Sequence, residues 1–360
     1  MVSLSLSLLL CALASVISAA NIQPRIKTDI ISPLQYNGTE TTSTLVSSAY
    51  GLDSPHVHGV NASSYEWWYF DAVSSDGLYS VVFTFYTAPG TGFPAGGPPD
   101  DILIAQISVS TPSNEILIGE DDSVFAKKAI VVSIGNGASG DWVGTGFSFT
   151  GASDLSAYTV VVDSTALDVK GTVSFKEYAP PHYPCSPVVA GVSLAALPDL
   201  GWAIGLSDAV ATVDLIVNGT AIQFTGVGYH DKNWGDVPFA AVVENSIWGH
   251  ARLGPYSIVW SQVLGRATGD YYQYGYIARD GAVITYGCTG FTLIPTTDPG
   301  TYSVSIVIPD RGTFEFNLTE LAIIAEMPPV YARNTGKITG GFVGGNQYSG
   351  VALYEHFTLG

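Results

Sequence analysis

The 360-residue sequence predicts an all-β protein built from antiparallel barrels or sandwiches. Its 40 glycines and 20 tyrosines occur with few helix-forming residues, a composition typical of β structure. Strand-like segments recur at regular spacing, and Asp76-Gly77, Asn218-Gly219 and Asp280-Gly281 mark tight hairpin turns. A chain of this length with so many strands predicts two β domains.

Residues 1–20 precede the predicted fold. Leu4 to Ile17 is an unbroken run of apolar and small residues, and Ser18-Ala19-Ala20 offers a boundary for cleavage. The segment lacks the usual positive charge at its start, but it still indicates a secretory signal peptide. No later stretch is long and apolar enough to cross a bilayer. We therefore expect a mature chain in the secretory pathway or outside the cell, without stable membrane insertion.

The first β domain is expected at residues 61–225, after an irregular Ser/Thr-rich arm at 21–60. Residues 65–71, YEWWYFD, are apolar on both faces, which indicates a strand buried between two layers. Residues 88–101 are crowded with proline and glycine and precede no helix pattern, so they do not predict a nucleotide loop. Residues 179–208 are interpreted as a long connection that includes a helical turn or two. The remaining strands are predicted at 79–87, 102–109, 130–134, 145–149, 158–163, 168–178, 211–217 and 222–229.

The second β domain is expected at residues 226–360, with the border somewhere near 220–240. A border between two β units is a preferred place for a ligand pocket. The strands of the second β domain are predicted at 246–253, 256–264, 271–278, 283–287, 302–308, 313–318, 336–343 and 347–359.

Charge and cysteine content restrict the partners and the compartment. A net charge of −18 repels nucleic acid and anionic lipid, so neither is expected as a partner. Outside the signal segment only Cys185 and Cys288 remain, and they predict one disulfide, with two buried free thiols as the alternative. Glycosylation sequons begin at four asparagines, Asn37, Asn61, Asn218 and Asn317.

Residues 224–235, FTGVGYHDKNWG, concentrate more chemistry than any other segment. Strand periodicity sends His230, Lys232 and Trp234 to one face and Tyr229, Asp231 and Asn233 to the other. Charged and aromatic groups on both faces are unusual for a plain strand with one wet side. The alternative is a bulged strand that leads into a turn, with His230 and Asp231 paired to each other.

Other kinds of catalytic or metal site have weaker candidates in this sequence. No nucleophile elbow is present, and neither mature cysteine has a catalytic context. His56 and His58 have strand spacing for two metal ligands, but no third ligand stands at a convincing spacing, so no metal is predicted. Four carboxyls in aromatic surroundings are candidate general acids, and a local ion pair or hydrogen bond is the alternative for each: Glu66, Asp71, Asp231 and Glu355.

Aromatic residues alternate with polar ones on several strands. Trp248, His250 and Arg252 share one face by period two, and so do Trp260 and Gln262. Such an inward face suits a cavity for a large apolar ligand with a few polar contacts.

Four segments together resemble the lipocalin-like superfamily that includes carotenoid 1,2-hydratases and fungal Diels–Alderases. They are residues 65–71, 226–235, 247–260 (IWGHARLGPYSIVW) and 353–357 (LYEHF), in the family's order and spacing. The resemblance covers the chain from about residue 60 to its end. It implies two lipocalin-like β domains with a hydrophobic pocket at or near their interface.

Among these proteins, the signal peptide and sequons resemble secreted fungal hetero-Diels–Alderases of tropolone–sesquiterpenoid pathways. The resemblance implies a cofactor-independent pericyclase that joins a tropolone quinone methide to a sesquiterpene such as humulene. Orientation of the two reactants and hydrogen bonds to a carbonyl would supply the catalysis. A hydratase of an apolar polyene or terpenoid, or a carrier of a hydrophobic metabolite, is the alternative. Oligomeric state is not indicated.

By the same analogy, two sets of residues are expected in the pocket. The polar, catalytic set is His230, Asp231, His250, Arg252, Gln262 and Lys232. The substrate-binding set is Glu66, Trp68, Trp234, Trp248, Trp260 and Tyr274.

Overall fold

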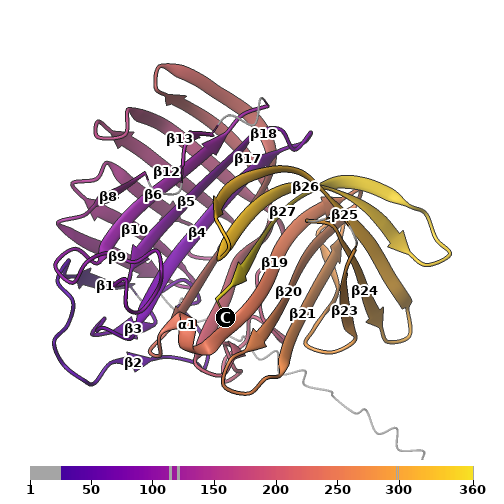
Figure 1. Cartoon of the computed structure of the whole chain (residues 1–360), viewed down its shortest axis with the longest axis horizontal. Helices are drawn as coiled ribbons and strands as arrows, with labels where there is room; N and C mark the ends of the chain where they lie inside the picture. The colour runs from indigo at the N-terminus through magenta and orange to yellow at the C-terminus, as the bar shows by residue number, and fades with distance from the viewer. Residues whose placement is uncertain (1–25, 113–115, 120–121, 297, 299, 360) are drawn as a thin grey trace, which may run out of the picture.

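The structure is a computed structural model that describes residues 26–112, 116–119, 122–296, 298 and 300–359. The predicted signal peptide lies outside these residues. Two curled antiparallel sheets make up nearly all of the described chain, and they lie side by side (Figure 1). The first is drawn from indigo through magenta toward orange, and the second from orange to yellow.

The first sheet has 16 strands, and its main path runs β1-β9-β10-β11-β12-β13-β17-β18-β4-β5-β6-β7. Short strands β8, β14, β15 and β16 pair off this path. The bounds along the path are β1 Ile26–Ile31, β9 Lys128–Ile134, β10 Gly137–Val143, β11 Phe147–Gly151, β12 Ala157–Ser164, β13 Val169–Ala179, β17 Leu200–Val217, β18 Thr220–Gly235, β4 Tyr65–Ser74, β5 Ser80–Thr87, β6 Leu103–Ser110 and β7 Ile116–Ile118. The off-path strands are β8 Ser123–Phe125, β14 His182–Tyr183, β15 Ser186–Pro187 and β16 Ala195–Leu197. A separate ribbon pairs β2 Thr42–Ser43 with β3 Val57–His58.

Curling brings the two limbs of the first sheet face to face around an aromatic core. The ring of Trp68 on β4 lies 5.7 Å from that of Trp142 on β10. Nε1 of Trp142 also donates to the carbonyl of Tyr86 on β5, at 3.1 Å. The interior of this barrel is therefore filled with side chains.

The second sheet has nine strands in the order β22-β21-β20-β19-β27-β26-β25-β24-β23. The bounds are β19 Val243–Leu253, β20 Tyr256–Gly265, β21 Tyr271–Arg279, β22 Ala282–Gly287, β23 Phe291–Pro295, β24 Tyr302–Ile308, β25 Gly312–Met327, β26 Tyr331–Phe342 and β27 Tyr348–Thr358. One helical turn, α1 (Phe239–Val242), leads from the first sheet into the second.

The expected all-β, two-barrel architecture is confirmed, with three differences in detail. The arm at 21–60 contains β1, which pairs with β9. The connection at 179–208 holds short strands and the first half of β17, and no helix is assigned within it. The first half of β17 is buried on both faces, so it lacks the alternation that marks a strand. The change of sheet falls between Gly235 and Val243, whereas a border after residue 225 would divide β18.

Candidate functional site

A cavity of about 650 Å³ lies between the two sheets. Trp67 and Tyr69 of β4 and Trp202 of β17 form part of its wall on the first sheet. Trp248 of β19 and Phe357 of β27 face it from the second sheet. A volume of this size, bounded mainly by aromatic and aliphatic side chains, is typical of a site for an apolar small molecule.

Strand β18 delivers one acidic side chain to this cavity. Because β18 pairs with β17 on one side and β4 on the other, its backbone is fixed and its side chains alternate between the two faces. Asp231 and Asn233 point to the cavity. His230, Lys232 and Trp234 point the other way, into the first barrel.

Asp231 is held by two hydrogen bonds to a single oxygen. Its Oδ2 accepts from Nε1 of Trp202 at 2.7 Å and from the hydroxyl of Tyr229 at 2.8 Å. Within the described chain its Oδ1 has no hydrogen-bond partner, and the side chain lines the cavity while the residue is only 4% exposed. Burial is the main cause that raises the pKa of Asp231 to about 7, and the charge of Glu355 adds to it. At neutral pH much of this carboxyl is protonated, so it can donate a proton.

A second carboxyl, Glu355 of β27, lines the same cavity. Its Oε1 accepts from Nε of Arg333 on the neighbouring strand β26, at 2.6 Å. The Arg333 guanidinium lies 5.5 Å from the ring of Tyr69. The hydroxyl of Tyr69 has no hydrogen-bond partner in the described part of the chain. The three residues form one polar corner in a largely aromatic cavity.

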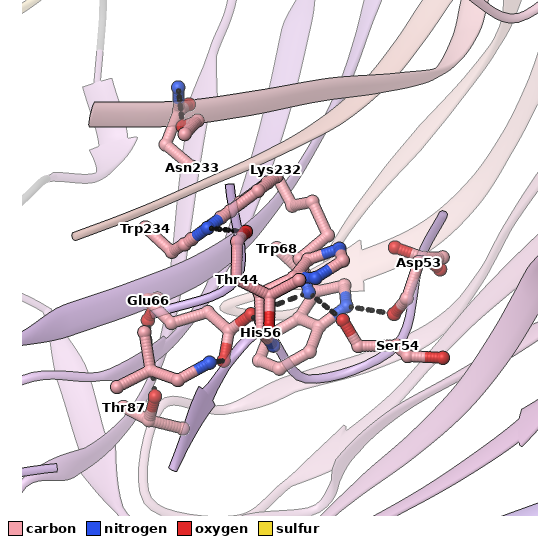
Figure 2. A network of polar contacts seen from close by, with 12 residues as sticks. Thr44, Asp53, Ser54, His56, Glu66, Trp68, Thr87, Lys232, Asn233 and Trp234 are labelled. Carbon is pink, nitrogen blue, oxygen red and sulfur yellow. Dashed lines mark hydrogen bonds and ion pairs between the residues drawn. The ribbon is translucent and has the colours of Figure 1, made fainter. Parts of the chain in front are cut away.

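The opposite face of β18 carries a separate polar network inside the first barrel (Figure 2). Nζ of Lys232 lies 2.7 Å from Oε1 of Glu66 and 4.0 Å from the Trp68 ring. Nε2 of His230 lies 3.2 Å from Oδ1 of Asp53, and the His230 ring stacks on Phe70. All of these groups are buried. The network ties β18 to β4 and to the segment at residues 53–56.

Two polar side-chain contacts cross from one sheet to the other beside the cavity. Nε2 of His250 on β19 lies 2.9 Å from Oδ1 of Asp71 on β4. Nε of Arg252, also on β19, donates to Oδ2 of Asp208 on β17 at 2.9 Å. These contacts hold the second sheet against the first.

Comparison with known proteins gives the family. The model of the Diels-Alderase-like family matches residues 27–292. The chain belongs to the Diels-Alderase-like family.

Two kinds of named proteins are similar to this chain in sequence. Quinolone epoxide rearrangement proteins asqO of Emericella nidulans and penF of Penicillium thymicola are each 32% identical, over 90% of this chain and 92% and 94% of theirs. Diels-Alderase cheD of Chaetomium globosum is 22% identical, over 84% of this chain and 72% of its own. The family and these relatives support an enzyme of pericyclase-type or cyclase-like reactions.

A solved structure agrees with the fold. CghA with Sch210972 superposes with a TM-score of 0.75 at 18% identity, covering 92% of this chain and 99% of that one. At this identity the likeness concerns the fold alone. It matches the two-barrel architecture that the Diels-Alderase-like resemblance implied.

Of the twelve residues expected in the pocket, the structure places Asp231 and Trp248 on the cavity. His230, Lys232, Glu66, Trp68 and Trp234 lie inside the first barrel. Because neighbours on a strand face opposite sides, His230 and Asp231 do not pair, which corrects the alternative given for residues 224–235.

The other expected residues lie on or behind the second sheet. His250 and Arg252 form the two polar contacts between the sheets. Trp260 packs against Phe316 in the core of the second sheet, and Gln262 accepts a hydrogen bond from Gln273. Tyr274 stacks on His182.

The sequence alone did not identify Tyr69, Arg333 or Trp202 as site residues. Arg333 is one of two cations on β26, and only the structure separates it, as the buried one, from the exposed Lys337. Glu355 was one of four candidate carboxyls, and the structure separates it from Glu66, which lies inside the first barrel, and from Asp71, which is in contact with His250 beside the cavity.

The predicted disulfide and the predicted glycosylation sites have different outcomes. The Cys185–Cys288 disulfide is confirmed. Asn37, Asn218 and Asn317 are exposed, whereas Asn61 is buried and its Oδ1 accepts from the backbone N–H of Ser63. Glycosylation at these sites remains a prediction.

Among the described residues, no helix is long and apolar enough to span a membrane.

Proposed function

We propose that this protein is an enzyme that rearranges an epoxide carried by an apolar aromatic substrate, with Asp231 as the general acid. The observation that carries the proposal is the Asp231 carboxyl, buried on the wall of an aromatic cavity, with one oxygen held by Trp202 and Tyr229 and the other open to a ligand. The 32%-identical relatives, named for quinolone epoxide rearrangement, support this choice of substrate.

The proposed reaction is an isomerisation. The Asp231 carboxyl protonates the epoxide oxygen, the C–O bond breaks, and positive charge develops on the adjacent carbon. A hydrogen or carbon group then migrates with its electron pair, a carbonyl forms, and the proton returns to Asp231. Aromatic faces stabilise positive charge, and several rings line this cavity. The aromatic and aliphatic walls shield the developing cation from part of the surrounding water.

The test is turnover of a quinolone that bears an aryl epoxide, followed by chromatography and mass spectrometry. We expect an isomer of unchanged mass. A product heavier by one water would indicate hydrolysis of the epoxide, and unchanged, bound epoxide would indicate the carrier.

Asp231→Asn is the informative variant. The amide oxygen must accept the bonds from Trp202 and Tyr229, because both are donors in the present arrangement. The amide N–H₂ then faces the cavity, and it can donate a hydrogen bond but cannot release a proton. We expect kcat to fall by about 100-fold or more, the range of general acid catalysis. Ser261→Ala, on the same cavity, should stay within about threefold, as expected for a loss of at most one weak hydrogen bond. An undiminished rate in Asp231→Asn would contradict the proposal.

A stereoselective Diels–Alder or hetero-Diels–Alder reaction is the second candidate, favoured by the Diels-Alderase-like family match. In that reaction the Asp231 carboxyl would polarise a carbonyl by a hydrogen bond. Since Asp231→Asn keeps a donor at this position, a cycloaddition should lose less than about tenfold, the worth of one hydrogen bond. The narrower pairing of a tropolone quinone methide with humulene stays a prediction, checked by chiral chromatography of the adduct. The family model and the relatives above do not support that specific pair.

We propose that the enzyme acts in the secretory pathway. The disulfide is compatible with an oxidising compartment. Sequencing of the N-terminus of the mature protein tests the predicted cleavage after about residue 20.

A further inference from the structure

A second hollow, of about 530 Å³, lies between β1 with the residues that follow it and the segment at residues 55–60. It shares no lining residue with the cavity between the sheets, and the proposed reaction does not use it. Three of its apolar side chains are well exposed: Ile30 at 69%, Leu34 at 57% and Tyr36 at 49%. Apolar side chains gathered around a concave surface indicate that something covers them.

Asn37 lines this hollow and begins the sequon Asn37-Gly38-Thr39. Asn37 and Thr39 are both exposed. Within the described residues the Asn37 side chain makes no hydrogen bond. Its amide nitrogen is therefore free to carry a sugar.

The other three sequons differ from this one. Asn61 is buried, and its Oδ1 accepts from both the backbone N–H and the hydroxyl of Ser63, the third residue of its own sequon. Nδ2 of Asn218 donates to a backbone carbonyl at 3.3 Å, and Oδ1 of Asn317 accepts from the hydroxyl of Ser303. None of these three asparagines lines the hollow. A glycan that starts inside the hollow can therefore start only at Asn37.

The ring of Tyr36 forms a platform next to the Asn37 amide. A Cβ at Gly38 would collide with this ring, and a Cβ at Gly59 would crowd it, so the two glycines let the ring lie close against the backbone. About half of the Tyr36 side chain stays exposed to the hollow. One face of an N-acetylglucosamine ring carries only C–H groups, which pack on an aromatic ring. Polar side chains for its hydroxyl and acetamido groups line the same hollow: Ser32, Gln35 and His58.

We propose that Asn37 carries an N-linked glycan whose first N-acetylglucosamine packs on the Tyr36 ring and fills this hollow. The glycan takes the place of a protein partner, because it covers the apolar side chains that the bare chain leaves exposed. The inference rests on the proposed location in the secretory pathway, where such glycans are added, and is independent of the proposed reaction.

The test uses the full-length chain, secreted from a yeast host with its own N-terminal segment. Glycopeptide mass spectrometry identifies the sequons that carry a glycan. The native protein is then treated with peptide N-glycosidase F, and glycan release is followed at each site. We expect release at Asn37 to be at least about tenfold slower than at Asn218 or Asn317, because the enzyme reaches the packed linkage only after the sugar leaves the hollow.

Tyr36→Ala removes the platform and leaves the sequon intact. It should raise the rate of release at Asn37 to that of the exposed sites, without changing release at Asn218. Tyr50→Ala is the matched control, since Tyr50 is a similarly exposed tyrosine, at 43%, that does not line the hollow. This control should keep the slow release at Asn37.

The outcomes separate this inference from the proposed location. A secreted chain with a glycan at Asn218 or Asn317 and none at Asn37 would overturn the inference and leave the location intact. Equal rates of release at Asn37 from the wild type and from Tyr36→Ala would also overturn it. A chain without a glycan at any sequon would contradict the proposed location, and the inference with it.

Discussion

Lys232 and Glu66 show how a charged residue can be essential to the fold while lying outside the cavity. Both side chains are buried, and desolvation lowers the pKa of Lys232 while the charge of Glu66 opposes this effect. The ammonium group also contacts the Trp68 ring and the carbonyl of Ser54. Removing one partner leaves the other charged and unpaired in a low-dielectric core.

We predict that Lys232→Met lowers the free energy of unfolding by about 3–5 kcal/mol, because it leaves Glu66 buried without its ion pair. Urea denaturation followed by tryptophan fluorescence measures the loss. Lys170→Met, at an exposed position on β13, should change stability by less than about 0.5 kcal/mol. The double variant Lys232→Met/Glu66→Gln should recover part of the loss, and a double variant no more stable than Lys232→Met would argue against the ion pair as its cause.

At the scale of the element, β18 explains both the success and the failure of sequence reasoning about the site. Period-two alternation correctly separated His230, Lys232 and Trp234 from Tyr229, Asp231 and Asn233. It could not say which face meets the cavity, because that depends on which face of β18 the second sheet packs against, and the pattern within β18 does not contain that information. Both faces are rich in polar and aromatic residues, so composition did not decide the question either.

The same limit applies to β20 and β21. Trp260 and Tyr274 have the residue type expected of a pocket wall, but their faces pack into other clusters. The neighbouring positions Ser261 and Val263 on β20 reach the cavity instead. Hydrophobic periodicity therefore predicted the strands and the two-barrel fold. It did not predict which of two neighbouring residues on a strand points into the cavity, and that choice determines the site residues.

At the scale of the whole molecule, the cavity exists only while the two sheets keep their relative position. Asp231, the proposed acid, belongs to the first sheet, through β18, and Glu355 belongs to the second, through β27. The two polar contacts made by His250 and Arg252 link the sheets. The disulfide also links them, because Cys185 lies between β14 and β15 of the first sheet and Cys288 follows β22 of the second.

We predict that Cys185→Ser/Cys288→Ser lowers the free energy of unfolding by about 4 kcal/mol. The cross-link closes a loop with a sequence separation of 103 residues, and a loop of that size loses considerable entropy in the unfolded chain. Thermal unfolding with and without reductant measures the effect. Reductant should lower the midpoint of the wild type and leave that of the double variant unchanged, and an equal midpoint for both proteins under oxidising conditions would contradict the prediction.

The pH dependence of kcat/KM for epoxide rearrangement tests the central claim most directly. The pKa of Asp231 is raised to about 7, so the carboxyl keeps its proton up to that pH and loses it above. We predict a constant rate on the acidic side and, on the alkaline side of about pH 7, a fall of about tenfold per pH unit. Asp231→Asn should give a low rate without this limb. A wild-type rate that stays constant or rises between about pH 6 and 9 would show that a protonated Asp231 is not the acid.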